Sequence, residues 1–306
     1  MPVKADKQTS IVTKVIREAF LFPRHIHEGR AQQSLGFIAG MSSFLGGLEV
    51  AYEHYRGSYG QKIMYTPVIF SVLGTGACLW GVVNSTISRT LMPAISLALL
   101  ADGVLGFFFH IRGVARKPGG WRIPAINITM GPPLFAPLLL GIGGYLGVIA
   151  SFMRREDRKD GTVRYHDVLK REIATGHFQK HMAVVSGIAA LLSGAEALYS
   201  HYKNNFRYKV RQWSPILLAP VLFAVAIYAV VNPKAARKIL PAVSLLAILD
   251  GTIGFLYHCR GVKRRPGGLK HPVYNVIYGP PVFAPLLFAA AGFLGILASI
   301  MKREEK

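Results

Sequence analysis

The sequence predicts an all-α integral membrane protein in which eight transmembrane helices form two tandem, parallel four-helix repeats with short amphipathic interfacial segments. The chain is 51% hydrophobic and has a mean hydropathy of +0.34, and long stretches of it carry no charge. The peptide HIRGVARKPGG at residues 110–120 returns as HCRGVKRRPGG at residues 258–268, and GPPLFAP at 131–137 returns as GPPVFAP at 279–285. Since both motifs recur after 148 positions, the chain contains an internal duplication.

The expected domains follow in chain order. Residues 1–30 form an N-terminal amphipathic interfacial segment, because Ile11, Val15 and Phe20 share one helical face and charged residues take the other. Residues 31–153 form the first membrane repeat, 154–180 a charged amphipathic linker, and 181–301 the second repeat, before a charged tail at 302–306. The linker is too short to hold a soluble core of its own.

Apolar length defines the membrane spans. Segments without Asp, Glu, Lys or Arg that reach the roughly 18 to 20 residues needed to cross a hydrocarbon core lie at 31–48, 63–88, 123–153, 212–233 and 271–301. Three more segments hold a single acid each: Asp102 in 90–111, Glu196 in 181–202 and Asp250 in 239–259. Together they predict spans at about 33–52, 64–83, 91–111, 133–153, 182–202, 215–231, 240–259 and 281–301.

Prolines mark the predicted starts of these spans, where a missing N–H costs nothing. They are Pro67, Pro93, Pro133, Pro215, Pro241 and Pro281. Helices are expected rather than a barrel, because the chain lacks the short alternating strands of a barrel. Four spans are an even number, so both repeats enter from the same side and are parallel, not inverted.

The formal net charge of +21 indicates contact with anionic lipid rather than nucleic acid, because the Lys and Arg residues lie in loops beside spans. Counted by side, 21 of the 36 basic residues lie with the N-terminus and 15 on the other face, which favours a cytoplasmic N-terminus in a bacterial-type inner or plasma membrane. A basic loop face also offers a docking surface for a peripheral protein partner. Cys78 and Cys259 are not equivalent and support neither a disulfide nor a thiolate metal site.

Titratable residues recur at matching places inside the spans of both copies. They are Glu49, His54, Asp102 and His110 in the first, and Glu196, His201, Asp250 and His258 in the second. A carboxylate retained in hydrocarbon is by default a functional candidate, and the four acids form a candidate proton path. The plain alternative is that protonated acids join helices by hydrogen bonds and that the histidines are polar tips at helix ends.

The histidines form two expected pairs. His54 and His110 lie near the C-terminal ends of two spans that run in the same direction, and so do His201 and His258. Two imidazoles at one depth match the axial ligands of haem b, so all four are candidate ligands of haem iron. Arg112 and Arg116 in the first copy and Arg260 and Arg264 in the second are candidate partners of the propionates, and Gly103, Gly106, Gly251 and Gly254 leave room for a flat ring.

The leading hypothesis is therefore a membrane-embedded electron-transfer subunit that links a peripheral redox partner to quinone, a non-catalytic part of an oxidoreductase complex. The alternatives are a proton- or cation-coupled transporter or channel, and a cofactor-free membrane anchor. An independent enzyme is disfavoured, because phosphate-binding loops, catalytic triads and zinc spacings are missing. The Gly-Pro-Pro element either starts the fourth span directly, which is favoured, or marks a broken helix where Asn127 and Asn275 meet an anion.

Overall fold

A computed structural model describes residues 30–153, 156–157, 163–164, 175–207 and 210–300. Residues 1–29, most of the predicted linker and the predicted tail lie outside this part, and with them both predicted amphipathic stretches. Within the linker, β1 (Glu156–Asp157) pairs antiparallel with β2 (Val163–Arg164). The rest of the described chain is helices and their connections.

Each half of the chain contributes four main helices and several short ones. The first half holds α2 (Arg30–Arg56), η1 (Lys62–Tyr65), α3 (Thr66–Val83), α4 (Ser85–Arg89), α5 (Leu91–Ala115), η2 (Gly120–Arg122), α6 (Pro124–Thr129) and α7 (Ala136–Phe152). The second half holds α9 (His177–Lys203), α10 (Val210–Val231), α11 (Pro233–Lys263), η3 (Gly268–Lys270), α12 (Pro272–Ile277) and α13 (Ala284–Ile300). Among the described residues, six helices are long and apolar enough to cross a membrane: α2, α3, α5, α9, α10 and α11. Helices α7 and α13 are apolar but shorter, at 17 residues each.

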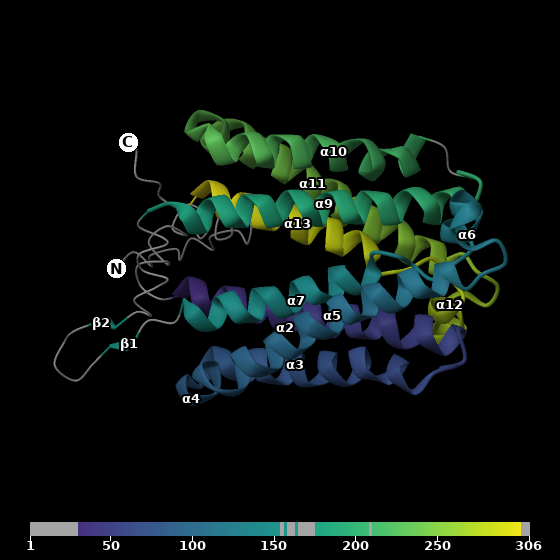
Figure 1. The fold of residues 1–306 in the computed structure, drawn as a ribbon, viewed down its shortest axis with the longest axis horizontal. Helices are drawn as coiled ribbons and strands as arrows, with labels where there is room; N and C mark the ends of the chain where they lie inside the picture. The colour runs from purple at the N-terminus through teal and green to yellow at the C-terminus, as the bar shows by residue number, and fades with distance from the viewer. Residues whose placement is uncertain (1–29, 154–155, 158–162, 165–174, 208–209, 301–306) are drawn as a thin grey trace, which may run out of the picture.

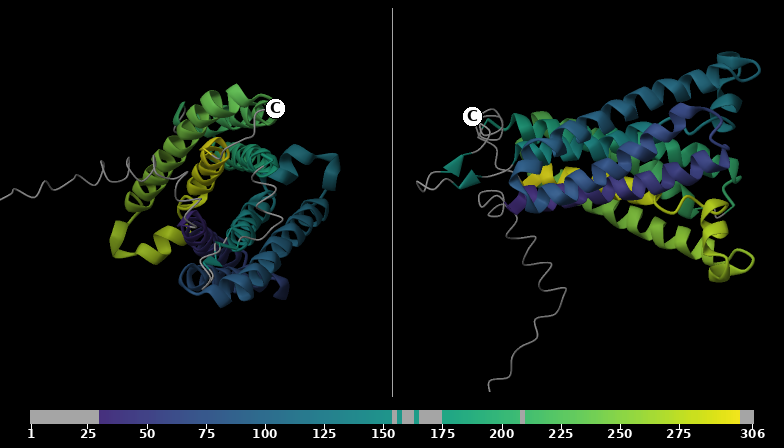
Figure 2. Two further views of the ribbon diagram at one scale, coloured as in Figure 1. Left: turned by 90° about the vertical axis from the view of Figure 1, so that its left-hand side faces the viewer. Right: turned by 90° about the horizontal axis from the view of Figure 1, so that it is seen from below.

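Helices α2, α7, α9 and α13 lie in the middle of the bundle (Figure 2). Helices α3 and α5 flank them on one side and α10 and α11 on the other (Figure 1). The halves meet where α7 contacts α9 and where α2 contacts α13. Helix α2 begins and α13 ends at the same end of the bundle, which we call the α4 end; the short helices α6 and α12 lie at the opposite, α6 end (Figure 1).

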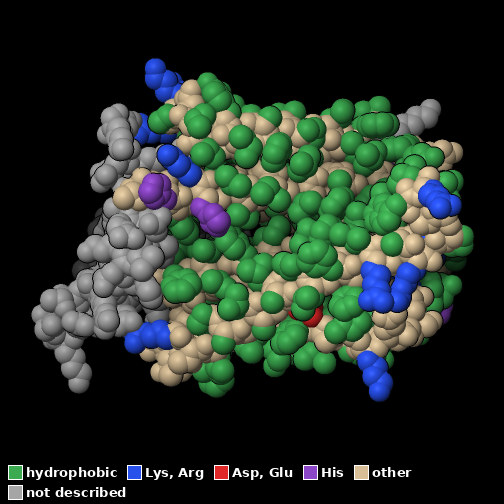
Figure 3. All heavy atoms as spheres, viewed as in Figure 1, with side chains coloured by type: hydrophobic (Ala, Val, Ile, Leu, Met, Phe, Trp, Pro, Cys, Tyr) green, Lys and Arg blue, Asp and Glu red, His purple; other side chains and the backbone are tan. Residues whose placement is uncertain are grey.

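The surface between the two ends is covered by hydrophobic side chains, and the Lys and Arg side chains gather toward the ends (Figure 3). Val83, Val210 and Val231 each leave more than three quarters of their surface exposed. Large apolar side chains on α5, such as Leu97 and Phe108, are also turned outward. Such a surface suits lipid rather than water, as expected of an integral membrane protein.

The predicted starts of four spans were wrong. Helices α7 and α13 begin after Pro133 and Pro281. The Gly-Pro-Pro stretch is not helical, and it separates α6 from α7 and α12 from α13. Pro215 and Pro241 lie inside α10 and α11 rather than at their starts. For α11 the reason is a polar cap: the Asn232 side chain accepts a hydrogen bond from the Ala235 amide at 3.0 Å and starts the helix two turns early.

Glycines bring α5 against α7 and α11 against α13 at backbone contact. A Cβ atom on Gly103 would lie 2.6 Å from the carbonyl oxygen of Pro137, and one on Gly251 would lie 2.5 Å from that of Pro285. A Cβ atom on Gly144 would lie 2.5 Å from the carbonyl oxygen of Ser96. These approaches need residues without side chains, as is usual where membrane helices pack.

Replacement of Gly103 by alanine is expected to destabilise the protein by about 1–3 kcal/mol, because the added methyl group meets backbone that cannot move aside. The measurement is the loss of monodisperse protein on heating in detergent, followed by size-exclusion chromatography. Gly76→Ala is the matched control, because nothing lies within 4 Å of a Cβ atom at Gly76. Equal melting of both variants would contradict the close packing of α5 on α7.

Candidate functional site

All four predicted histidines lie at the α6 end, and each one bonds to a backbone carbonyl through Nδ1. His54 lies 2.7 Å from the oxygen of Met64, His110 2.5 Å from that of Pro133, and His201 2.9 Å from that of Gln212. His258 makes the same contact with the oxygen of Pro281. Because a carbonyl only accepts hydrogen bonds, Nδ1 carries the proton in each ring and the neutral imidazole keeps its lone pair on Nε2.

His54 on α2 and His110 on α5 lie within the range of an electrostatic interaction, and so do His201 on α9 and His258 on α11. Among the described residues, the Nε2 atoms of these four rings have no hydrogen-bond partner.

An aromatic side chain covers one histidine of each pair, a feature that the sequence analysis missed. Tyr59 meets His54 edge-on with ring centroids 6.0 Å apart, and Phe206 meets His201 at 6.5 Å. Both aromatic residues lie in turns with positive φ, at 45° each. The available signal was an aromatic residue five positions after the histidine in both halves.

Asp102 and Asp250 lie beside hydroxyl groups of the neighbouring helix. The Thr66 hydroxyl donates to Asp102 at 2.6 Å, and Ser214 holds the matching place beside Asp250. Asp102 is also close enough to His54 for their charges to interact. The sequence signal for this contact was a hydroxyl residue near the start of the second long helix of each half, Thr66 in α3 and Ser214 in α10.

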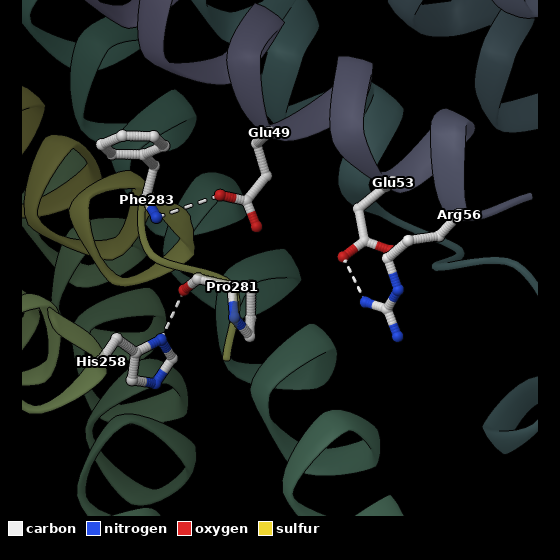
Figure 4. Close-up of polar contacts among 6 residues, drawn as sticks. All are labelled: Glu49, Glu53, Arg56, His258, Pro281 and Phe283. Atoms are coloured by element: carbon white, nitrogen blue, oxygen red, sulfur yellow. Dashed lines mark hydrogen bonds and ion pairs between the residues drawn. The ribbon is translucent and has the colours of Figure 1, made fainter. Parts of the chain in front are cut away.

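Glu49 and Glu196 reach across to the other half. The Phe283 amide at the start of α13 donates to Glu49 Oε2 at 3.0 Å, and the Phe135 amide at the start of α7 donates to Glu196 Oε2 at 3.0 Å. Figure 4 shows Glu49 directed at Phe283, while Glu53 turns away and pairs with Arg56. The first amides of a helix have no partner within it, so a carboxylate here satisfies groups that would otherwise be left unpaired.

The four predicted arginines are exposed: Arg112 and Arg260 lie in the last turns of α5 and α11, and Arg116 and Arg264 directly follow these helices. The expectation that glycines leave room for a ring was wrong on the α7 side: a Cβ atom on Gly103 or Gly106 would meet Pro137. Any flat group held by His54 and His110 therefore lies away from that face of α5.

The Gly-Pro-Pro element marks a broken helix, so the favoured direct start was wrong. The associated anion site is not formed either, because the two asparagines are buried and engaged in turns. Asn127 Nδ2 donates to the carbonyl oxygens of Pro118 at 3.0 Å and Gly120 at 2.7 Å. Asn275 makes the same two bonds to Pro266 and Gly268. They hold the Pro-Gly-Gly turn against α6 and α12.

Within the described chain, no group of three or more His, Cys, Asp or Glu residues is placed to hold a metal ion by itself. Cys78 and Cys259 are both free thiols. Comparison of the chain with family models, curated proteins and solved structures found no match. Function is therefore inferred from the geometry of the site.

Replacement of Asn127 by alanine is expected to destabilise the protein by about 1–3 kcal/mol, because a buried side-chain amide and the two hydrogen bonds that it donates are lost. It should also speed trypsin cleavage after Lys117, which lies in the turn that Asn127 holds. Asn204→Ala is the control, since Asn204 is exposed. Unchanged melting and cleavage in Asn127→Ala would show that the turn is held by other contacts.

Proposed function

We propose that this protein is a membrane-embedded electron-transfer subunit that binds one haem b in each half. His54 and His110 hold the first haem iron, and His201 and His258 the second. Electrons pass between a peripheral redox partner and quinone. The protein is accordingly a part of a membrane oxidoreductase complex rather than an enzyme by itself.

The observation that carries this proposal is the common state of the four imidazoles. Each Nδ1–H is bonded to a backbone carbonyl, and each Nε2 is without a partner among the described residues. Histidines that bind metals are usually oriented in this way, since the second nitrogen fixes the tautomer and the ring plane. A haem needs only two such nitrogens, so it does not require a group of three or more ligands, and none is found in the described part of the chain. When bound, it supplies one-electron chemistry.

Other residues support the proposal by what they offer near the pairs. Arg112 and Arg116 remain available to propionates, as do Arg260 and Arg264. Thr66 and Asp102 are bonded to each other beside His54, and they offer a proton donor and acceptor for quinone chemistry.

We further propose eight transmembrane helices in two parallel repeats. Helices α7 and α13 rise about 26 Å, near the thickness of a hydrocarbon core, and they lie in the centre of the bundle. Helix α2 begins and α13 ends at the α4 end, as an even number of spans requires, and we assign this end to the cytoplasmic side of a bacterial-type inner membrane. The basic loops of both ends face anionic lipid, and one basic face binds the peripheral partner.

The rival functions have less support. A transporter would use Glu49, Asp102, Glu196 and Asp250 as a path for protons or cations. Two of these acids, Glu49 and Glu196, each bind a backbone amide at a helix start, which gives them a structural role instead. A cofactor-free anchor gives no reason for four histidines that share one tautomer and whose Nε2 atoms have no partner among the described residues.

Protein purified in mild detergent from cells supplied with haem is expected to show the Soret and α bands of a six-coordinate haem b in its reduced-minus-oxidised spectrum. His54→Ala and His110→Ala should each remove about half of the absorbance, because one of the two proposed sites is lost. The variant without all four histidines should show none.

His271→Ala is the control, because His271 is exposed and lies at the same end, outside the pairs. Purified protein without these bands, under conditions that retain haem in other cytochromes, would overturn the proposal. Cation uptake by cofactor-free proteoliposomes that Asp102→Asn abolishes would instead favour the transporter.

A further inference from the structure

The peptide between Pro133 and Leu134 is hydrogen bonded at both of its polar atoms. Its carbonyl oxygen accepts from His110 Nδ1 at 2.5 Å, and its N–H donates to the Tyr199 hydroxyl at 2.8 Å. His110 belongs to the first half and Tyr199 to α9 in the second. One rigid peptide plane therefore connects a histidine of one pair to a side chain of the opposite half.

A carboxylate lies beside this tyrosine. Glu196 is close enough to Tyr199 to interact with it electrostatically, and it accepts from the next amide, that of Phe135, at 3.0 Å. Two hydrogen bonds therefore join His110 to Tyr199 through one peptide, with Glu196 next to the tyrosine on the same helix.

The other half has the corresponding arrangement. Glu49 accepts from the Phe283 amide, and the Pro281 carbonyl accepts from His258 (Figure 4). Tyr52 lies beside Glu49 and the Val282 amide. Its hydroxyl does not reach hydrogen-bond geometry with a described residue, so this connection is looser than the one through Tyr199.

Helices α2 and α9 each contribute to both sites. Helix α9 carries His201 of the second pair. Two and five residues before it, the same helix carries Tyr199 and Glu196, which contact the peptides next to the first pair. Helix α2 carries His54, with Tyr52 and Glu49 directed to the second pair. The two sites are therefore connected by reciprocal contacts rather than separated by an inert interface.

We propose that Tyr199 is a positioning residue for His110 of the opposite half: it holds the peptide that locks His110 with the proton on Nδ1 and with Nε2 directed at the group it binds. Tyr52 is its looser counterpart for His258. Hydrogen bonds in a chain polarise one another, and partners behind a ligand set its orientation and basicity. That the ligand is haem iron rests on the proposed function, while the locking of the rings does not.

A role in helix capping alone would give a different pattern. The Phe135 amide is already satisfied by Glu196, and the cap would persist without the tyrosine hydroxyl. If Tyr199 only filled space, phenylalanine would replace it without any effect on a ring in the other half. The effect on the opposite ring is thus the decisive readout.

The experiment is nitrogen-15 NMR of the imidazoles in full-length, cofactor-free protein labelled at histidine, with His110 and His258 assigned by single replacement. In Tyr199→Phe, the ratio of the Nδ1–H to the Nε2–H form of His110 should fall about fivefold, as expected when a neutral hydrogen bond is weakened. His258 should not change. Tyr52→Phe should affect His258 and not His110, and by less, because its contact is looser.

Tyr202→Phe and Tyr55→Phe are the matched controls, since these tyrosines are exposed on the same two helices. An unchanged His110 in Tyr199→Phe, or equal changes in both halves, would overturn the proposal. If Tyr199→Phe does not fold, Glu196→Gln keeps an acceptor for Phe135 but removes the charge, and it should shift the Nδ1 resonance of His110 and leave that of His258.

This measurement is independent of the haem. Purified protein without haem bands, together with a shift at His110 in Tyr199→Phe, would reject the cofactor and retain the positioning role. Haem bands together with an unchanged His110 would do the reverse.

Discussion

Buried backbone groups must find partners where water is scarce, and this constraint is most severe where a helix starts inside the bundle. The Gly-Pro-Pro stretches interrupt the helical structure just before α7 and α13. The amides of Leu134, Phe135 and Phe283 therefore lie at helix starts with no partner in their own helix. Carboxylate and hydroxyl groups from the opposite half satisfy these amides. The recurrence of Glu49 as Glu196 follows from that need.

The same contacts explain how the two halves fit together. Apolar packing among α2, α7, α9 and α13 builds the centre of the bundle, but it does not specify one register between them. The hydrogen bond that the Phe135 amide, just before α7, donates to Glu196 does, because it forms only at one depth and one rotation. Since the histidines bond to carbonyls of the same stretches, the register also fixes the level at which Nε2 atoms are presented.

The sequence predicted the residues of the candidate site better than their partners. The four histidines and Asp102 are recognisable because polar groups within apolar spans are expensive and recur after 147 or 148 positions. Thr66, Tyr59 and the carbonyl of Pro133 were missed, because threonine, tyrosine and proline near the ends of spans are common for other reasons. The glycines were misassigned, since a glycine that admits a ligand and one that admits a neighbouring helix look alike in sequence.

The sequence by itself determined that the chain is helical and apolar enough for a membrane, because length without charge is a local property. It also showed that two motifs recur after 148 positions. From these patterns it predicted both histidines of a pair near the ends of spans with the same direction. The tertiary structure decided that α7 and α13 start late and that Glu49 and Glu196 cross to the opposite half. Those features depend on which amides lack a partner after packing, and packing joins residues 234 positions apart, as in the bond between Glu49 and Phe283.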